Sequence, residues 1–126
     1  MTLGQVRVHG GGDWPVARLA GEVDLSNVEA LSRLVQAAVT NAAVGLVLDL
    51  TGVSYLDSTG LRMVFQLARE LNHRQQQLVL VVPSDALIWP VLRCGGVPDV
   101  MEVFASVSDA LAGTMTGALP DTAGAS

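Results

Sequence analysis

Residues 49–61 read DLTGVSYLDSTGL and join two different sequence patterns. A wholly apolar run at residues 46–48 precedes this stretch, which is typical of a strand that is buried on both faces. After it, apolar residues recur every three or four positions, which predicts an amphipathic helix that begins at Ser58. The stretch itself is small, polar and interrupted by glycines, so we expect a loop between the strand and the helix.

Ser58 lies at the predicted start of that helix, beside the carboxylate of Asp57. Serine is a favoured N-cap because its hydroxyl oxygen accepts a hydrogen bond from a backbone N–H of the first turn. Asp57 is favourable there because partial positive charge gathers at a helix N-terminus. Gly60 costs the helix about 1 kcal/mol relative to alanine, but it permits close approach of another backbone or protein. The residues alone therefore indicate a capping serine and leave a contact role open.

Catalysis at Ser58 is not expected, because its sequence frame and its neighbours lack the required groups. Hydrolases of the α/β class place serine in Gly-x-Ser-x-Gly, whereas this chain has Leu56 at the first glycine position. His9 lies on a predicted outer strand, and His73 lies at the far end of a helix of about 15 residues, roughly 22 Å long. A phosphate-binding loop needs a lysine, which the chain lacks, and two carboxylates, Asp24 and Asp57, are too few for a metal site. We expect no catalytic residue, metal or cofactor.

The composition narrows the possible partners and compartments. The chain has 126 residues, of which 50% are hydrophobic, and a net charge of −5. Its seven arginines are scattered along the sequence, which argues against the clustered cations of a nucleic-acid interface. Cys94 is the only cysteine, so an internal disulfide is impossible. There is no secretion signal and no apolar run near the roughly 20 residues of a membrane span, so we expect a cytoplasmic protein without membrane contact.

Strand and helix patterns alternate along the rest of the chain, which predicts an α/β fold with a mostly parallel sheet. Ser26, with Glu29 three residues later, has the form of a capping box for a helix that ends near Asn41, although Asn27 could also cap it. After residue 113 the composition shifts to small and polar residues, so we expect one domain over 1–113 and a disordered tail over 114–126. The remaining predicted elements are strands at 5–9, 14–19, 78–82 and 100–104, a break at 21–24, a helix at 85–93 that Pro90 interrupts, and a helix capped by Ser106 or Ser108.

Several stretches, in this order, resemble the STAS domain, named after sulphate transporters and anti-sigma factor antagonists. The first is GEVDLSN at residues 21–27, and the most specific is LDLTGVSYLDSTGL at residues 48–61. Residues 91–104 and 108–111 are similar to the late helix, final strand and closing helix of that family. The resemblance covers about residues 4–113. It implies a mixed sheet of four or five strands with helices packed mainly on one face.

Stand-alone domains of this length resemble anti-sigma factor antagonists, which are binding proteins and not enzymes. They bind an anti-sigma factor that is also a serine kinase of the GHKL type, and a sigma factor is released. The resemblance implies that this kinase phosphorylates Ser58, that a serine phosphatase resets it, and that the chain is a monomer or weak dimer; Thr59 offers a second hydroxyl. The partner-binding residues that it implies are Glu22, Asp24, Ser26, Asn27, Asp57, Ser58, Thr59, Gly60 and Arg62.

Two other kinds of role stay open at this point. Within the same family, the chain could be a scaffold subunit of a stress-sensing complex, or the soluble partner of a lipid-transport ATPase. In both, the surface would bind protein without a phosphoswitch. An enzymatic or nucleotide-binding role at the Asp24 and Ser58 loops is weaker, because a lysine and a positioned base are missing.

Overall fold

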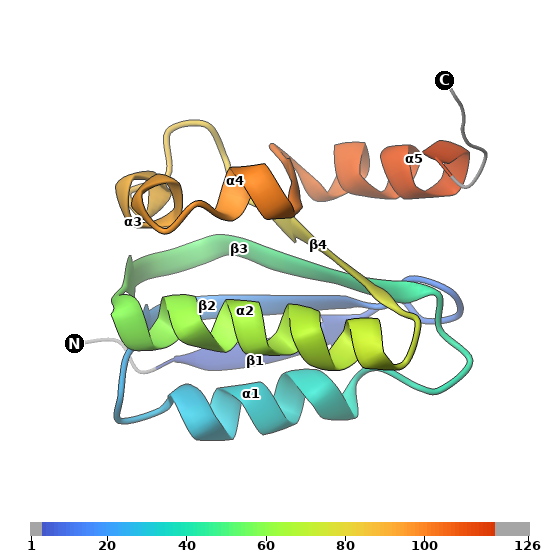
Figure 1. The fold of residues 1–126 in the computed structure, drawn as a ribbon, viewed down its shortest axis with the longest axis horizontal. Coiled ribbons are helices and arrows are strands. Elements are labelled where there is room, and N and C mark those ends of the chain that lie inside the picture. The colour runs from blue at the N-terminus through green and yellow to red at the C-terminus, as the bar shows by residue number, and fades with distance from the viewer. Residues whose placement is uncertain (1–3, 118–126) are drawn as a thin grey trace.

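The computed structural model describes residues 4–117, with the side chains of residues 4–114, and confirms the predicted α/β fold (Figure 1). One mixed sheet has the strand order β1-β2-β3-β4-β5, in which β1 and β2 are antiparallel and the other neighbours are parallel. The strands are β1 Gln5–His9, β2 Val16–Val23, β3 Gly45–Leu56, β4 Gln77–Val81 and β5 Glu102–Phe104. The helices are α1 Val28–Ala37, α2 Ser58–His73, α3 Trp89–Cys94, α4 Val97–Val100 and α5 Val107–Gly117.

The main hydrophobic core lies on one face of the sheet, beneath α1, α2, α3 and α4. Leu46, Leu48 and Leu50 of β3 point into this core and are buried. Val47 points to the opposite face, where it packs in a smaller cluster with Ala110 of α5. This alternation along a strand is what a sheet that is covered on both faces requires. The expected packing of helices mainly on one face is confirmed, and α5 is the only described helix on the other face.

β3 is longer than predicted, because it continues through Leu56 across the stretch that we expected to be a loop. β2 likewise continues through Val23, where the pattern predicted a break. The two strands pair in parallel, with register shifts at two points where β3 carries an extra residue. Gly52 fits close to β2, since a Cβ on it would lie 2.9 Å from the Cβ of Ala20. Pairing with a neighbouring strand has overridden the loop-forming composition of this stretch.

α1 ends at Ala37, before the predicted end near Asn41. The turn that follows is held by Gln76, a buried side chain that directly precedes β4. Its Nε2 donates hydrogen bonds to the backbone oxygens of Thr40 at 2.8 Å and Ala43 at 3.0 Å. The carboxamide therefore links the α1–β3 connection to the α2–β4 connection.

The later helices also differ from the prediction. The helix expected at 85–93 is reduced to α3, in which Pro90 occupies the first turn, where proline is compatible with a helix start. The predicted capping of the last helix by Ser106 is confirmed, because its Oγ accepts from the backbone N–H of Asp109 at 3.0 Å. α5 then continues to Gly117 and so extends into the tail that was expected to be disordered. The rest of that expected tail, residues 118–126, lies outside the described residues.

Candidate functional site

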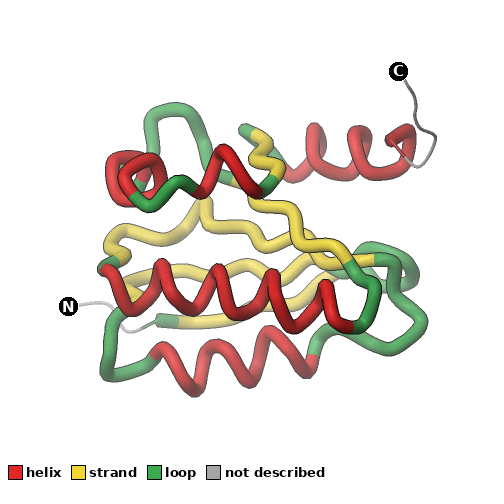
Figure 2. The backbone as a smooth tube through the Cα atoms, viewed as in Figure 1, coloured by secondary structure: helices red, strands yellow, loops and turns green. Residues whose placement is uncertain are grey.

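The β2–α1 loop and the β3–α2 junction leave the sheet side by side (Figure 2). Val23 pairs with Leu56 at the ends of β2 and β3, so Asp24 and Asp57 follow at the same level of two neighbouring strands. Neighbouring strands lie about 4.8 Å apart, and the carboxyl ends of parallel strands are a common place for binding sites. We call the surface formed by Glu22, Asp24, Asp57 and Ser58 the Ser58 edge.

Asp57, and not Ser58, caps α2. Its backbone is extended, and its Oδ1 accepts from the backbone N–H groups of Thr59 at 2.9 Å and Gly60 at 3.1 Å. Ser58 is the first residue of the helix. The predicted capping role of Ser58 is therefore wrong, because the neighbouring carboxylate, which also benefits from the helix dipole, already takes the free N–H groups.

The Ser58 hydroxyl is consequently available to another molecule. The side chain is exposed at the N-terminus of α2, and it has no hydrogen-bond partner in the part of the chain that the structure describes. No histidine, lysine or carboxylate accepts its proton within residues 4–117. A hydroxyl in this setting lacks the positioned base that a nucleophile needs, but it can be modified by an external catalyst that brings its own base.

The β2–α1 loop is closed by its own hydrogen bonds. Asp24 Oδ1 accepts from the backbone N–H and from the hydroxyl of Ser26, at 2.9 Å and 2.5 Å. Asn27 Oδ1 accepts from the backbone N–H of Asp24 at 3.0 Å, and its Nδ2 donates to the backbone oxygen of Glu22 at 2.7 Å. The predicted capping box of Ser26 and Glu29 is wrong, because Ser26 bonds to Asp24 and Asn27 is the N-cap residue, without a side-chain cap bond.

The first turn of α2 sits directly on the strand ends. Gly60 is buried, and a Cβ on it would lie 2.7 Å from Leu56 Cδ1 and 3.1 Å from Val23 Cγ1. Thr59 is partly buried and Arg62 is exposed, and both line a groove of about 340 Å³ between α1 and α2. Of the predicted site residues, Arg62 thus lies one helical turn away from the Ser58 edge.

Exposed apolar side chains beside these loops were missed from the sequence. Leu25 in the β2–α1 loop is 77% exposed, Tyr55 near the end of β3 is 50% exposed, and Leu87 after β4 is 80% exposed. Large apolar groups gathered at one end of a sheet commonly mark a protein contact. For Leu25 and Tyr55 the available signal was an apolar residue outside the predicted strands and helices, whereas Leu87 fell within the helix predicted at 85–93. The exposure of all three side chains depends on the tertiary fold and cannot be read from periodicity.

Other kinds of site are not found in the described part of the chain. No three His, Cys, Asp or Glu side chains over residues 4–117 could hold a metal ion together. None of the helices described there has the length and apolar character needed to cross a bilayer. A hollow of about 850 Å³ lies at the opposite end of the sheet, lined by His9, Trp14 and Leu111 among others, and it includes none of the predicted site residues.

A known domain family and known proteins are similar to this chain in sequence. A family model described as the STAS domain matches residues 5–110. The anti-sigma-B factor antagonist of Listeria monocytogenes is 33% identical over 85 residues, which are 68% of this chain and 74% of that protein. The putative anti-sigma factor antagonist BtrV of Bordetella bronchiseptica is 38% identical over 65 residues, which are 52% of this chain and 56% of that protein.

Solved structures share the fold at lower sequence identity. An anti-sigma factor antagonist from Mycobacterium paratuberculosis has a TM-score of 0.79 and 23% identity, over 90% of this chain and 95% of its own. The unphosphorylated anti-sigma factor antagonist SpoIIAA has a TM-score of 0.68 and 21% identity, over 90% of this chain and 99% of its own. Because the family model spans most of the sequence and the fold agrees, this chain belongs to the STAS domain family.

Proposed function

We propose that this chain is an anti-sigma factor antagonist. It binds an anti-sigma factor that is also a serine kinase of the GHKL type, a sigma factor is released, and phosphorylation of Ser58 ends the binding. The observation that carries the proposal is the exposed Ser58 hydroxyl, which has no partner among the described residues and begins α2. Family membership and two relatives named as antagonists support the same role. The role is cytoplasmic and needs no nucleic acid, membrane, cofactor or catalytic residue of this chain.

In this role the chain only has to present the Ser58 hydroxyl as a substrate, and the kinase performs the phosphoryl transfer. A kinase supplies its own base, metal ions and nucleotide, so an accessible hydroxyl in a defined position is sufficient. Asp57 supplies that position by capping α2 with bonds to Thr59 and Gly60. The resulting phosphate would stand at a helix N-terminus, where partial positive charge stabilises anions. A serine phosphatase would restore the free hydroxyl.

The effect of the phosphate would fall on the partner. Phosphorylation adds about −1.5 to −2 charge at a place where Asp24 and Asp57 already follow the ends of two neighbouring strands. Unit charges about 4 Å apart interact by about 1 kcal/mol in water and about 4 kcal/mol at an effective dielectric constant of 20. Each 1.4 kcal/mol of lost interaction weakens binding about tenfold. A change of this size is enough to separate a bound state from a free state.

The binding surface that we propose combines acidic, polar and apolar groups. It contains the predicted residues Glu22, Asp24, Ser26, Asn27, Asp57, Ser58, Thr59, Gly60 and Arg62. The exposed side chains of Leu25 and Tyr55 add apolar area beside them. Apolar anchors surrounded by polar groups are the usual composition of a specific protein interface.

Phosphorylation by a kinase tests the proposal directly. The purified chain is incubated with the GHKL-type anti-sigma factor encoded nearest to it and with ATP, and the product is mapped by mass spectrometry. We expect one phosphate on Ser58, because its hydroxyl is exposed, and none in Ser58→Ala. Thr59→Ala is the matched control, and it should still accept phosphate.

Binding of the same anti-sigma factor is measured in parallel by calorimetry. The unmodified chain should bind, and the phosphorylated chain should bind at least about tenfold more weakly, the equivalent of about 1.4 kcal/mol. Transfer to Thr59 in place of Ser58 would contradict the assigned residue. Equal affinity of the two forms would contradict the switch.

A further inference from the structure

The fold gathers cations that are scattered along the sequence. Four of the seven arginines lie on α1 and α2 or at the C-cap of α2, whereas these helices carry two glutamates and the N-cap Asp57. The arginines are Arg33, Arg62, Arg69 and Arg74, and all four are exposed. The α1–α2 layer is thus net positive on a chain of net charge −5. Such a local reversal of sign steers a partner of the opposite charge.

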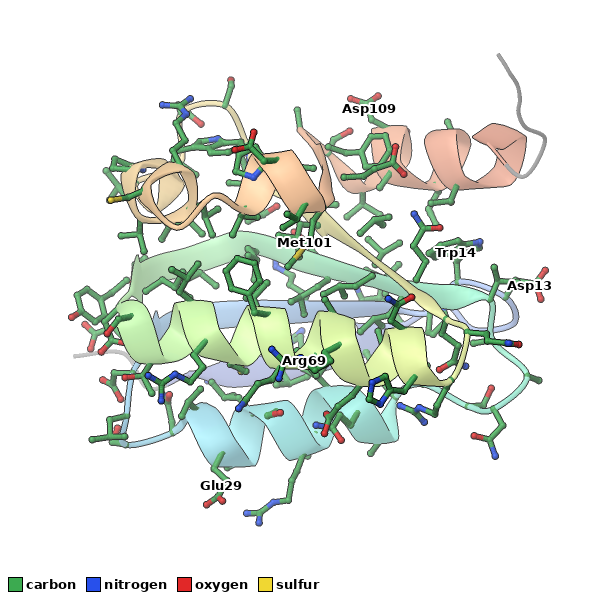
Figure 3. The ribbon with its side chains drawn as sticks, in the orientation of Figure 1. Asp13, Trp14, Glu29, Arg69, Met101 and Asp109 are labelled. Atoms are coloured by element: carbon green, nitrogen blue, oxygen red, sulfur yellow. The ribbon has the colours of Figure 1, made fainter. Side chains whose placement is uncertain are left out.

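Two of these four arginines have a glutamate at a favourable spacing on their own helix, and two do not. Glu29 precedes Arg33 by four residues on α1, and the second glutamate precedes Arg74 by four on α2, which is the favourable spacing for opposite charges. Arg62 and Arg69 have no carboxylate three or four residues away on α2. Among the described side chains, none of the four arginines has an ion pair within 4 Å. Glu29 lines the groove between α1 and α2 together with Arg62, but Figure 3 shows it pointing away from Arg69.

Arg62 and Arg69 form part of one exposed line along α2. The line, which we call the α2 stripe, consists of Ser58, Arg62, Gln66, Arg69 and His73, spaced by three or four residues. Such spacing places side chains above one another on a helix. The two arginines are seven residues apart, which corresponds to two turns and about 10.5 Å. The α2 stripe contains no carboxylate, and Ser58 stands at its start.

A groove beside the α2 stripe offers room for the side chains of a bound segment. It has a volume of about 340 Å³ and lies between α1 and α2. Arg33 and the single carboxylate Glu29 line it from α1, and Arg62 and Gln66 line it from α2. Met63, whose side chain is 2% exposed, forms part of its lining. A groove with guanidinium groups at its rim and an apolar base fits a segment with carboxylates on one face and small apolar groups on the other.

We propose that the α2 stripe binds an acidic helical segment of the anti-sigma factor, in which two carboxylates about two turns apart meet Arg62 and Arg69. This inference rests on the proposed function and extends the proposed contact from Arg62, which already belongs to it, along α2 to Arg69. It also connects that contact to phosphorylation, because Ser58 precedes Arg62 by four residues. A phosphate on Ser58 would compete for the Arg62 guanidinium and would repel the carboxylates of the segment.

A charge-matched pair of variants tests the proposal. Arg62→Gln/Arg69→Gln removes the two cations of the α2 stripe. Arg7→Gln/Arg18→Gln removes two exposed cations that face each other on β1 and β2, on the sheet face opposite to α2. The probe is the GHKL-type anti-sigma factor encoded nearest to this chain, and association is followed by surface plasmon resonance at low and high salt.

We expect the α2 variant to bind about tenfold more weakly than the wild type at ~50 mM salt, with a slower association rate. The control variant should stay within about threefold of the wild type, since its charges lie outside the contact. The difference should shrink at ~500 mM salt, where screening is strong. Thermal melts verify that both variants are folded.

Three results would overturn the inference. The α2 variant could bind as tightly as the wild type, both variants could lose affinity equally, or the loss could persist unchanged at high salt. In each case Ser58 phosphorylation and wild-type binding would still hold, so the proposed function would survive. Failure of the wild-type chain to bind the anti-sigma factor would instead remove the proposed function, and this inference with it.

Discussion

Asp57 and Ser58 divide two roles between them at the start of α2. The Asp57 carboxylate takes the free N–H groups of Thr59 and Gly60, while the Ser58 hydroxyl stays exposed. A serine that capped the helix would have its oxygen engaged by the backbone, and a kinase would have to break that bond. The one-residue offset therefore allows a stable helix end and an available hydroxyl at the same place.

Removing the Asp57 carboxylate tests this division at the level of single residues. Asp57→Ala should lower the free energy of unfolding by about 1 kcal/mol, because two N–H groups lose their acceptor. Asp57→Asn keeps an acceptor and should cost less. Urea denaturation followed by circular dichroism measures the differences. Ser58→Ala is the control, and a loss there as large as that of Asp57→Ala would show that Ser58 contributes to the cap.

The sequence was sufficient to predict Ser58 at a helix start, but not to identify the cap. Aspartate and serine are both good N-cap residues, and periodicity locates a helix end only to within one or two positions. The same limit explains Ser26, which had the spacing of a capping box but bonds to Asp24 in the structure. The family resemblance named the residues expected at the site, and the backbone path decided which hydrogen bonds they make.

Among the elements, the full length of β3 could not be predicted from the local sequence. The apolar run that includes Leu46 and Leu48 was predicted as a strand and is one, but the glycine- and serine-containing stretch after it was predicted as a loop. That stretch is a strand because β2 pairs with it up to Leu56, with extra residues accommodated at two register shifts. Such pairing is non-local, so neither composition nor a 3.6-residue period reports it.

The start of β3 offers a test of how closely this element is packed. A Cβ on Gly45 would lie 2.2 Å from the backbone oxygen of Gln77 and 2.5 Å from the ring of Trp14. Gly45→Ala should therefore lower the free energy of unfolding by about 1–3 kcal/mol, measured by chemical denaturation. Gly11→Ala is the matched control, because nothing lies within 4 Å of its added Cβ. Equal stability of the two variants would contradict the close approach of β3 and β4 at this point.

For the whole molecule, folding separates charges that the sequence mixes. The Ser58 edge carries Glu22, Asp24 and Asp57, and the neighbouring α2 stripe carries Arg62 and Arg69. The composition gives the net negative charge of the chain. It could not predict how the charges are separated on the surface, because that depends on which helix faces lie side by side. Two adjacent surfaces of opposite sign give a partner an orientation as well as an affinity.

The phosphorylated domain should remain folded. A phosphate on Ser58 would meet the N-terminus of α2 and would stand four residues before Arg62, so both the helix dipole and a cation offset its charge. We expect the Tm of the phosphorylated chain to stay within about 5 °C of that of the unmodified chain, measured by calorimetry. Arg62→Gln should lower the Tm of the phosphorylated form more than that of the unmodified form. A cooperative loss of structure on phosphorylation would contradict this and would imply that the switch works by unfolding.

The sheet order has a consequence for how the chain folds as it is synthesised. The strands lie across the sheet in the same order as along the chain, from β1 to β5. Each strand that leaves the ribosome can therefore add to the open edge formed by the strand before it, and none has to enter between two strands that are already paired. β3 and α2 can thus join a preformed β1–β2–α1 unit before β4 emerges, so the junction that presents Ser58 can assemble before β4 and the elements after it are in place.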